Sequence, residues 1–475
     1  MRRWVLAGGA TALIVMPAAL AFFSGGFFDE ARIIAALAAW ALVLAAAVFA
    51  PRPLPRSTSA RLALVGLALL AAWTALSSAW APLGGLAQDD AQRALLYLGY
   101  FTAAVALMRD ARVRPVLEPA LALLAFAVVA YALSERLLPG LFELERSRSA
   151  AGRLEQPFTY WNAAGIAAAI GFVLATRVVG DPGRPRPLRG VLAAAAVPLG
   201  LGVYLSFSRG ALAAVAVGVL VLVALAPDGR AQLRSVVVLV CTGAVAALVA
   251  NRLPTVKSLA DNDAGEGLLM LAVLVLLAGA AAFLAPRTPR RRIELPSLPG
   301  SRPAVVAVAA IGIAVAVGVI VAASEGKPEA VSPTAGANPG RLGSIESNRY
   351  RYWEVALDTF ADHPFAGVGS GGFAVEWLKV RDRADAVRDA HSLYLETAAE
   401  LGVVGVALLL LFLGGIAAAA VRLYRLDPRA AAGPVAGAAA WAFHAALDWD
   451  WEMPAVSLTA LLLAAAVVAW SEEAA

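Results

Sequence analysis

The stretch YLSFSRGALAAVAVGVLVLVAL, residues 204–225, is an apolar run in which Arg209 is the only charged residue. Uncharged runs of about 18 or more residues recur along the chain, and that length allows a helix to span a bilayer. The whole chain is 60% apolar, against about 45–50% in soluble domains. A transmembrane β-barrel would show short alternating segments instead. The pattern therefore predicts an all-α fold, a polytopic transmembrane helical bundle.

Apolar windows give fourteen predicted spans. The short fourth window and the adjacent seventh and eighth are the least distinct, so we expect about 12–14 spans. The N-terminus has the form of a signal peptide, and we interpret it as the first helix. The predicted spans cover residues 4–23, 33–50, 62–80, 94–108, 113–134, 160–176, 190–208, 210–226, 235–251, 267–285, 303–323, 397–421, 430–447 and 454–470.

Positive charge predicts the orientation of these spans. With the N-terminus in the cytoplasm, 22 of the 39 lysines and arginines fall inside, and 8 of the 17 outside lie in one long loop. Cytoplasmic loops carry such an excess. We therefore expect a multi-pass protein of the cytoplasmic (inner) membrane with both termini in the cytoplasm. The net charge of +5 reflects this sidedness, so the partner it indicates is the lipid bilayer and no nucleic acid is expected.

The spacing of the spans divides the chain into four regions. We predict N-terminal transmembrane helices (1–150), central transmembrane helices with the Ser-Arg-Gly motif (151–323), an extracytoplasmic loop domain (324–396) and C-terminal transmembrane helices (397–475). The loop holds RYRYWEVALDTF, with apolar residues at helical spacing, and FAVEWLKVRDRADAVRDAHSLYLE, which predicts one or two amphipathic helices. A structured loop of this size suggests an external active site or lid.

Arginines at the outer side are candidates for binding an anion. Arg209 has apolar runs on both sides, where a charge is costly unless it is paired or solvated. It is either an interfacial arginine or a ligand for a buried anion, which the planar guanidinium suits. Arg349 and Arg351 begin the first loop helix, either on a solvated face or as a second anion clamp. Two positions apart they point to different faces, so at most one should face the site.

Two of the chain's three histidines are candidates for a role in the site. His391 precedes the twelfth span, with Asp389 as a plausible N-cap, and is either an interfacial histidine or a general base. His444 and Asp448 are four residues apart and are expected to meet on one helix face. They belong either to an aromatic interfacial belt or to a set of groups that support the site. His363 is expected to pack or cap the loop.

The glycines Gly367 and Gly369 begin a G-x-G-x-x-G pattern in HPFAGVGSGGF. No apolar strand precedes them, which argues against dinucleotide binding. We expect a tight turn whose backbone N–H groups face an anion. The single cysteine, Cys241, forms no disulfide framework. No His, Asp and Glu group has metal-ligand spacing, so neither a metal nor another cofactor is expected.

Four segments in order resemble the O-antigen ligase and O-antigen polymerase superfamily over about residues 150–470. SFSRGALAAVAVG is similar to its Ser-Arg-Gly motif, and NRYRYWEVALDTFADHPFAGVGSGGF to its loop signature, in which an arginine stands four residues before a tryptophan. AHSLYLETAAELGVVG resembles a segment of the family in which a histidine is followed by a helix. Ser392 stands where asparagine is common in the family. GRLEQPFTYWNAAGIAAAIGF resembles an earlier segment, matching Arg153 and Asn162.

This resemblance implies a glycosyltransferase of the membrane surface, a glycan ligase or polymerase. Such enzymes move a glycan from a polyprenyl-diphosphate carrier to an acceptor hydroxyl at the outer face of the membrane, without a metal. Carried over, His391 would be the base and Arg209 and Arg349 would bind the diphosphate, with Arg153 as a weaker contact. The acceptor, a glycan, lipid or protein, stays open.

A multispan transporter or flippase of lipid or polysaccharide is the alternative from another class. Transporters carry ionisable or helix-breaking groups near the midplane, often in two related halves. Here the predicted spans are nearly free of charge at their centres, and polarity concentrates in one outer loop. That asymmetry favours chemistry at the membrane surface.

Overall fold

Helices occupy the apolar runs, and their ends fall at the charged and Pro/Gly-rich breaks between them. The computed structural model of the chain describes residues 2–287, 336–339, 348–381 and 386–473. Within these residues every regular element is a helix, apart from one isolated bridge between Pro139 and Phe142. Ten of the described helices are long and apolar enough to cross a membrane. The prediction of a polytopic helical bundle is confirmed.

Thirteen of the fourteen predicted spans fall on helices, and the other, 303–323, lies outside the described residues. The elements are α1 (Arg2–Ala21), η1 (Ser24–Gly26), α2 (Asp29–Phe49), α3 (Thr58–Ser77), α4 (Gly84–Leu107), α5 (Arg114–Leu137), α6 (Trp161–Val179), α7 (Arg186–Leu205), α8 (Arg209–Leu225), α9 (Gly229–Ala250), α10 (Pro254–Ser258), α11 (Ala264–Leu284), α13 (Arg349–Asp362), α14 (Phe373–Val380), α15 (Leu393–Leu426), α16 (Pro428–His444), η3 (Asp450–Glu452) and α17 (Pro454–Glu473).

Helix α4 begins at Gly84, well before the predicted start at residue 94. Its first turns carry acidic and basic side chains that an apolar window excludes. Asp89 forms an ion pair with Arg32 at 3.0 Å, and Arg93 lies 3.4 Å from Glu452. Because these charges are compensated within the protein, the helix can extend through them.

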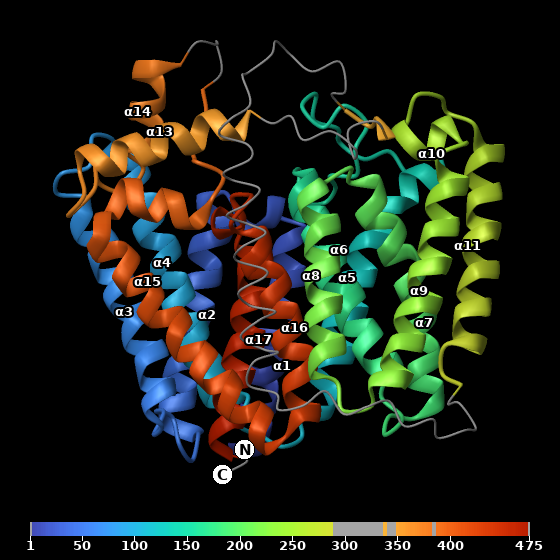
Figure 1. Ribbon diagram of the computed structural model, residues 1–475, viewed down its shortest axis with the longest axis horizontal. Coiled ribbons are helices and arrows are strands. Elements are labelled where there is room, and N and C mark those ends of the chain that lie inside the picture. Colours follow the sequence, from blue (N-terminus) through green and yellow to red (C-terminus); the bar gives the residue numbers. More distant parts are fainter. Residues whose placement is uncertain (1, 288–335, 340–347, 382–385, 474–475) are drawn as a thin grey trace.

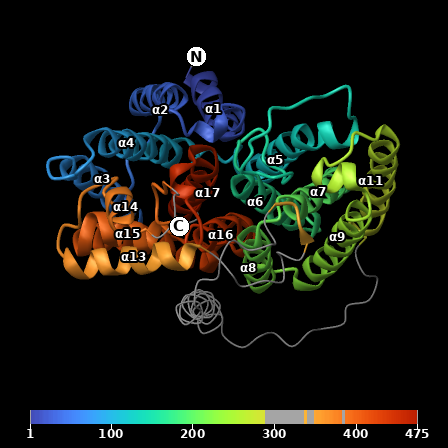
Figure 2. The same ribbon diagram turned by 90° about the horizontal axis from the view of Figure 1, so that it is seen from above.

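The long helices stand roughly parallel, and the first and last described residues lie at the same end of the bundle (Figure 1). We call the opposite end, where α10, α13 and α14 lie, the loop face. Seen from above, α5 to α11 form one group and α1 to α4 with α13 to α15 another, with α16 and α17 between them (Figure 2). In both α6 and α17, 94% of the apolar window is buried, so these two helices form the centre of the core.

Helix α15 is interrupted near the loop face at Gly402, where the backbone adopts φ 65° and ψ −166°. This region of backbone space is accessible essentially to glycine alone. The interruption frees backbone groups, and the turn 363–372 supplies their partners. Val403 N–H donates to the Pro364 carbonyl at 2.7 Å, while Gly369 N–H donates to the Glu400 carbonyl at 2.9 Å. These bonds pair backbone groups that the break would otherwise leave without partners, which matters in a membrane protein.

The Glu400 side chain strengthens the same junction. Its carboxylate accepts hydrogen bonds from the backbone N–H groups of Gly371 at 2.9 Å and Phe373 at 3.0 Å. Gly367 has φ 64°, and a Cβ there would lie 2.2 Å from the Glu400 carbonyl carbon. The turn 363–372 is therefore fixed to α15 by backbone and side-chain bonds, and it anchors α13 and α14 above the bundle.

Replacing Gly402 by alanine is expected to destabilise the protein by about 1–3 kcal/mol through the backbone alone. The new Cβ would also lie 2.3 Å from the Phe365 carbonyl oxygen. Gly414→Ala is the matched control, because it lies in the same helix and no atom stands within 4 Å of its added Cβ. Thermal unfolding in detergent should show a lower Tm for G402A alone; equal Tm values would contradict the proposed role of the break.

Candidate functional site

The residues singled out in the sequence lie at helix ends that meet at the loop face. Asn162 is in the first turn of α6, and Arg209 is the first residue of α8. Arg349 is the first residue of α13, and His444 is the last of α16. These ends converge on the segment between α16 and α17, residues 445–453, which we call the polar turn.

Asp448 is the centre of the polar turn, and its side chain is fully buried. One carboxylate oxygen accepts from Arg349 Nη2 at 2.6 Å, and the other accepts from Tyr160 Oη at 2.7 Å and Trp449 N–H at 3.0 Å. Asn162 Nδ2 in turn donates to Tyr160 Oη at 2.7 Å. A continuous chain of hydrogen bonds thus joins α6, the polar turn and α13.

The network keeps Asp448 ionised. Burial alone would raise the pKa of Asp448, but the positive charges of Arg349 and His444 outweigh burial and hold that pKa below its ordinary value. Arg349 also donates through Nη1 to the Leu447 carbonyl. Its guanidinium is therefore fixed in position by these bonds rather than mobile in solvent.

His391 lies against this network with its ring between two aromatic side chains. The ring stacks on Trp449 with centroids 5.7 Å apart and contacts Tyr352 at 5.5 Å. Its Nδ1 lies 3.0 Å from the carbonyl oxygen of Asp389. Since a carbonyl only accepts, Nδ1 carries the proton in the neutral ring and Nε2 carries the lone pair.

Burial and the positive charge of Arg349 lower the pKa of His391 below its usual value. The neutral ring is therefore the dominant form at neutral pH. This is the form in which Nε2 can accept a proton.

The start of α15 differs from the expectation. The helix begins at Leu393 and its N-cap is Ser392, whose Oγ accepts from Leu395 N–H at 3.5 Å. The prediction that Asp389 caps the helix and that His391 lies within it is wrong, because His391 has φ 55° and stands outside the helix. The cap also explains Ser392, since serine and asparagine are both preferred N-caps.

The expected contact between His444 and Asp448 on one helix face is also wrong, because α16 ends at His444. His444 Nδ1 instead lies 2.6 Å from Asp450 Oδ2, and the two side chains are 0% and 1% exposed. The chain reverses after the helix, which brings Asp450 rather than Asp448 to the ring. Sequence spacing alone could not show this reversal.

The remaining arginines fall in different surroundings. Arg209 is half-buried at the N-terminus of α8, after the N-cap Ser208. Arg153 is buried, donates to the carbonyls of Ala150 and Ser149, and stacks over Trp161 at 3.4 Å. Arg153 thus holds its own loop together.

Arg351 points away from Asp448 and pairs with Glu354 at 2.6 Å on the exposed side of α13. The expectation that only one of Arg349 and Arg351 faces the site agrees with this geometry.

The backbone N–H groups of the turn 363–372 donate to acceptors that belong to the protein itself. Gly367 N–H donates to the His363 carbonyl and Gly369 N–H to the Glu400 carbonyl. The next donors along, Gly371 and Phe373 N–H, bind the Glu400 carboxylate, as described above. In the second segment of the loop, FAVEWLKVRDRADAVRDAHSLYLE, the described residues form α14 and the first turn of α15, and residues 386–392 are not helical.

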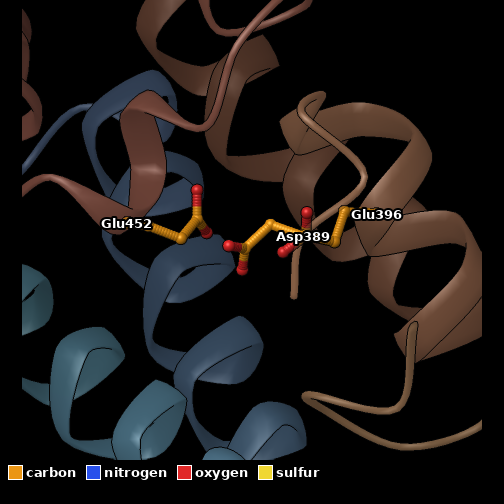
Figure 3. A group of neighbouring side chains, drawn as sticks. All are labelled: Asp389, Glu396 and Glu452. Carbon is orange, nitrogen blue, oxygen red and sulfur yellow. The ribbon is translucent and has the colours of Figure 1, made fainter. Parts of the chain in front are cut away.

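A group of three carboxylates was not foreseen, because its members come from distant parts of the chain. Asp389, Glu396 and Glu452 offer oxygen atoms within 4.8 Å of one another. Figure 3 shows the side chains in a row, with Asp389 in the middle. They line a cavity of about 580 Å³ that also contains Arg93 and Arg388. Oxygen ligands of this kind suit a hard divalent cation.

Burial is the main reason that the pKa of Asp389 rises to about 6 and that of Glu452 to about 8. Arg93 opposes both shifts.

Together these features define a multi-pass helical membrane protein in which His391, Arg349 and Asp448 lie together at one end of the bundle. Residues 267–410 match the family model described as O-antigen ligase. Over these residues the chain is similar to that family, which confirms the resemblance seen in the sequence. The match supports a membrane function of the O-antigen ligase or polymerase type. No curated protein matches the chain.

Asp448→Asn should lower stability, because it leaves the Arg349 guanidinium without its buried counter-charge. Removing one partner of a buried pair costs about 3–5 kcal/mol, and Arg349 is 22% exposed, so we expect the lower end. Glu354→Gln removes the partner of exposed Arg351 in the same helix and should cost about 1 kcal/mol or less. Chemical denaturation in detergent compares the two; equal losses would show that the Arg349 pair has no special role.

Proposed function

We propose that the protein transfers an oligo- or polysaccharide from a polyprenyl-diphosphate carrier to an acceptor hydroxyl, at the outer face of the cytoplasmic membrane. The observation that carries this proposal is the geometry of His391. Its Nδ1–H is engaged by the Asp389 carbonyl, its Nε2 bears the lone pair, and Arg349 is held beside it by Asp448. A base next to a fixed cation suits attack on a phosphorylated donor.

In this proposal His391 Nε2 takes the proton of the acceptor hydroxyl as the oxygen attacks the anomeric carbon. The bond between that carbon and the phosphate oxygen breaks on the opposite side, so the anomeric centre is inverted. Arg349 and Arg209 stabilise the charge that develops on the leaving diphosphate. No step of this scheme uses a metal or a nucleotide.

An apolar hollow supports a lipid-linked donor. It is a partly open groove with a cavity volume of about 40 Å³, lined by α1, α5, α6 and α17, with Pro17, Leu121 and Ile170 among its residues. Phe158 and Val456 line its upper part, near the polar turn. A prenyl chain lying there would place its diphosphate toward the polar turn, where Asp448 and its partners lie.

The distribution of charged residues supports the proposal that the loop face lies at the outer face of the membrane. The three histidines and most of the acidic residues belong to segments at the loop face, and the excess of lysine and arginine belongs to segments at the end that holds both termini. The gathering of titratable groups at one end also favours a transferase over a transporter, whose ionisable groups belong at the midplane.

The rate of glycan transfer from donor to acceptor should depend strongly on His391. With the full-length protein in nanodiscs and a defined lipid-linked oligosaccharide, His391→Gln should lower transfer by about 10²–10⁴-fold, the usual contribution of a general base. His363→Gln, an exposed histidine of the same face, is the control and should transfer normally. Undiminished transfer by H391Q would exclude this residue as the base, and no consumption by the wild type would exclude the proposed donor.

Arg349 should set the pH dependence of transfer. The pKa of His391 is lowered by burial and by Arg349, so kcat/KM of the wild type should fall with acidification only below the ordinary histidine value of about 6.5. Arg349→Gln removes the lowering charge and leaves Asp448, which raises the pKa, so the acidic limb should move to higher pH. Lys379→Gln on α14 is the control, and a limb that stays in place in R349Q would contradict the assignment.

A further inference from the structure

The buried pair His444–Asp450 has no part in the steps above, although it lies at the same site. Asp450 Oδ2 lies 2.6 Å from His444 Nδ1, and both side chains are almost wholly buried. The Asp450 backbone carbonyl accepts from Ser457 Oγ at 2.6 Å, which fixes the polar turn onto α17. The second ring nitrogen of His444, Nε2, is buried and has no hydrogen-bond partner in the part of the chain that the structure describes.

The surroundings favour a positively charged His444 ring. A buried carboxylate in a short hydrogen bond stabilises an imidazolium, and the C-terminal end of a helix, here α16, favours positive charge. Facing groups from other elements have both signs. They are Asp448 and Asp450 of the polar turn, Arg349 of α13, Tyr394 of α15, Tyr160 before α6, and Arg209 of α8.

The charged ring points its second N–H at the start of another helix. A Cβ built on Gly210 would lie 2.9 Å from His444 Nε2. Gly210 is in the first turn of α8, next to Arg209. The positive end of a 17-residue helix that begins with Arg209 therefore faces a buried ring nitrogen without a partner among the described residues. A helix N-terminus and an imidazolium N–H both attract an anion, and phosphate oxygens suit them best.

We propose that His444 is the proton donor to the leaving diphosphate, and that it works as an acid opposite His391 as the base. This rests on the proposed function, because it takes the carrier diphosphate as the donor. As the bond between the anomeric carbon and oxygen breaks, its electron pair goes to the phosphate oxygen, which receives the Nε2 proton of His444. His391 receives the acceptor's proton and releases it to solvent, and His444 takes one proton from solvent, so both side chains return to their starting states.

The new charge on the leaving group is the second charge of a phosphate monoester, whose conjugate acid has a pKa of about 6. An imidazolium hydrogen-bonded to that oxygen can neutralise the new charge as it develops, which is the task of a general acid. Asp450 is then a positioning residue that fixes the ring and its tautomer.

The chain has only three histidines, so their ring nitrogens can be observed individually. The full-length protein, labelled with 15N-histidine in nanodiscs, should show a protonated His444 ring at neutral pH, with signals assigned through H363Q and H391Q. Adding inorganic pyrophosphate or farnesyl diphosphate should shift the His444 Nε2 signal and leave His363 unchanged. A neutral His444 ring, or a signal that does not respond to either probe, would overturn the proposal.

Transfer kinetics give the second test. His444→Gln keeps an amide near the Nε2 position but has no proton to give, so kcat should fall by about 10²–10⁴-fold with little change in KM for the carrier. The basic limb of the wild-type pH profile, which reports the acid, should disappear while the acidic limb of His391 remains. H363Q is again the control. Wild-type kcat and an unchanged basic limb in H444Q would contradict the role of an acid.

Gly210→Ala provides a variant that leaves His444 in place in the sequence. The added methyl would displace the ring from the α8 terminus, so kcat should fall and the Nε2 signal should lose its response to pyrophosphate. Normal kcat in a folded G210A would contradict the proposal. Failure of the proposed function is recognised separately, because a wild type that consumes no carrier diphosphate shows it whatever His444 does.

Discussion

The buried carboxylate of Asp448 is the constraint on which the loop face depends. A carboxylate without solvent must find donors and a counter-charge, and its partners come from three separate parts of the chain. Tyr160 precedes α6, Arg349 begins α13, and Trp449 follows in the polar turn. The hydrogen bonds and the ion pair of this one carboxylate therefore fix the position of α13 on the bundle. The carboxylate also holds in place Arg349 and Trp449, which lie near His391.

The bundle itself could be predicted from the sequence, because crossing a bilayer requires long uncharged runs and these are visible in one dimension. The helix start at Arg349 and the two-sided arrangement of Arg349 and Arg351 follow from the same periodicity. Local reversals could not be predicted. Asp450 replaces Asp448 beside His444 because α16 stops at the histidine, and no residue spacing records where the chain turns after a helix.

Features that join distant segments were also hidden. The glycines of the turn 363–372 suggested anion binding, and the structure gives them the Glu400 carboxylate and backbone carbonyls as partners. Their role follows from the break in α15, which appears in sequence only as one glycine among many. The carboxylates Asp389, Glu396 and Glu452 come from a loop, a helix and the polar turn. A pattern search over sequence spacing cannot find such a group.

The central position of α17 has a consequence for the order of assembly during synthesis. This helix follows all the other described helices in the chain, yet it contacts α1, α4, α15 and α16 and is almost wholly buried among them. The polar turn is made immediately before it. The helices that are inserted earlier therefore lack these packing partners until α17 has been inserted. The arrangement at the loop face can therefore form only after α17 has been inserted.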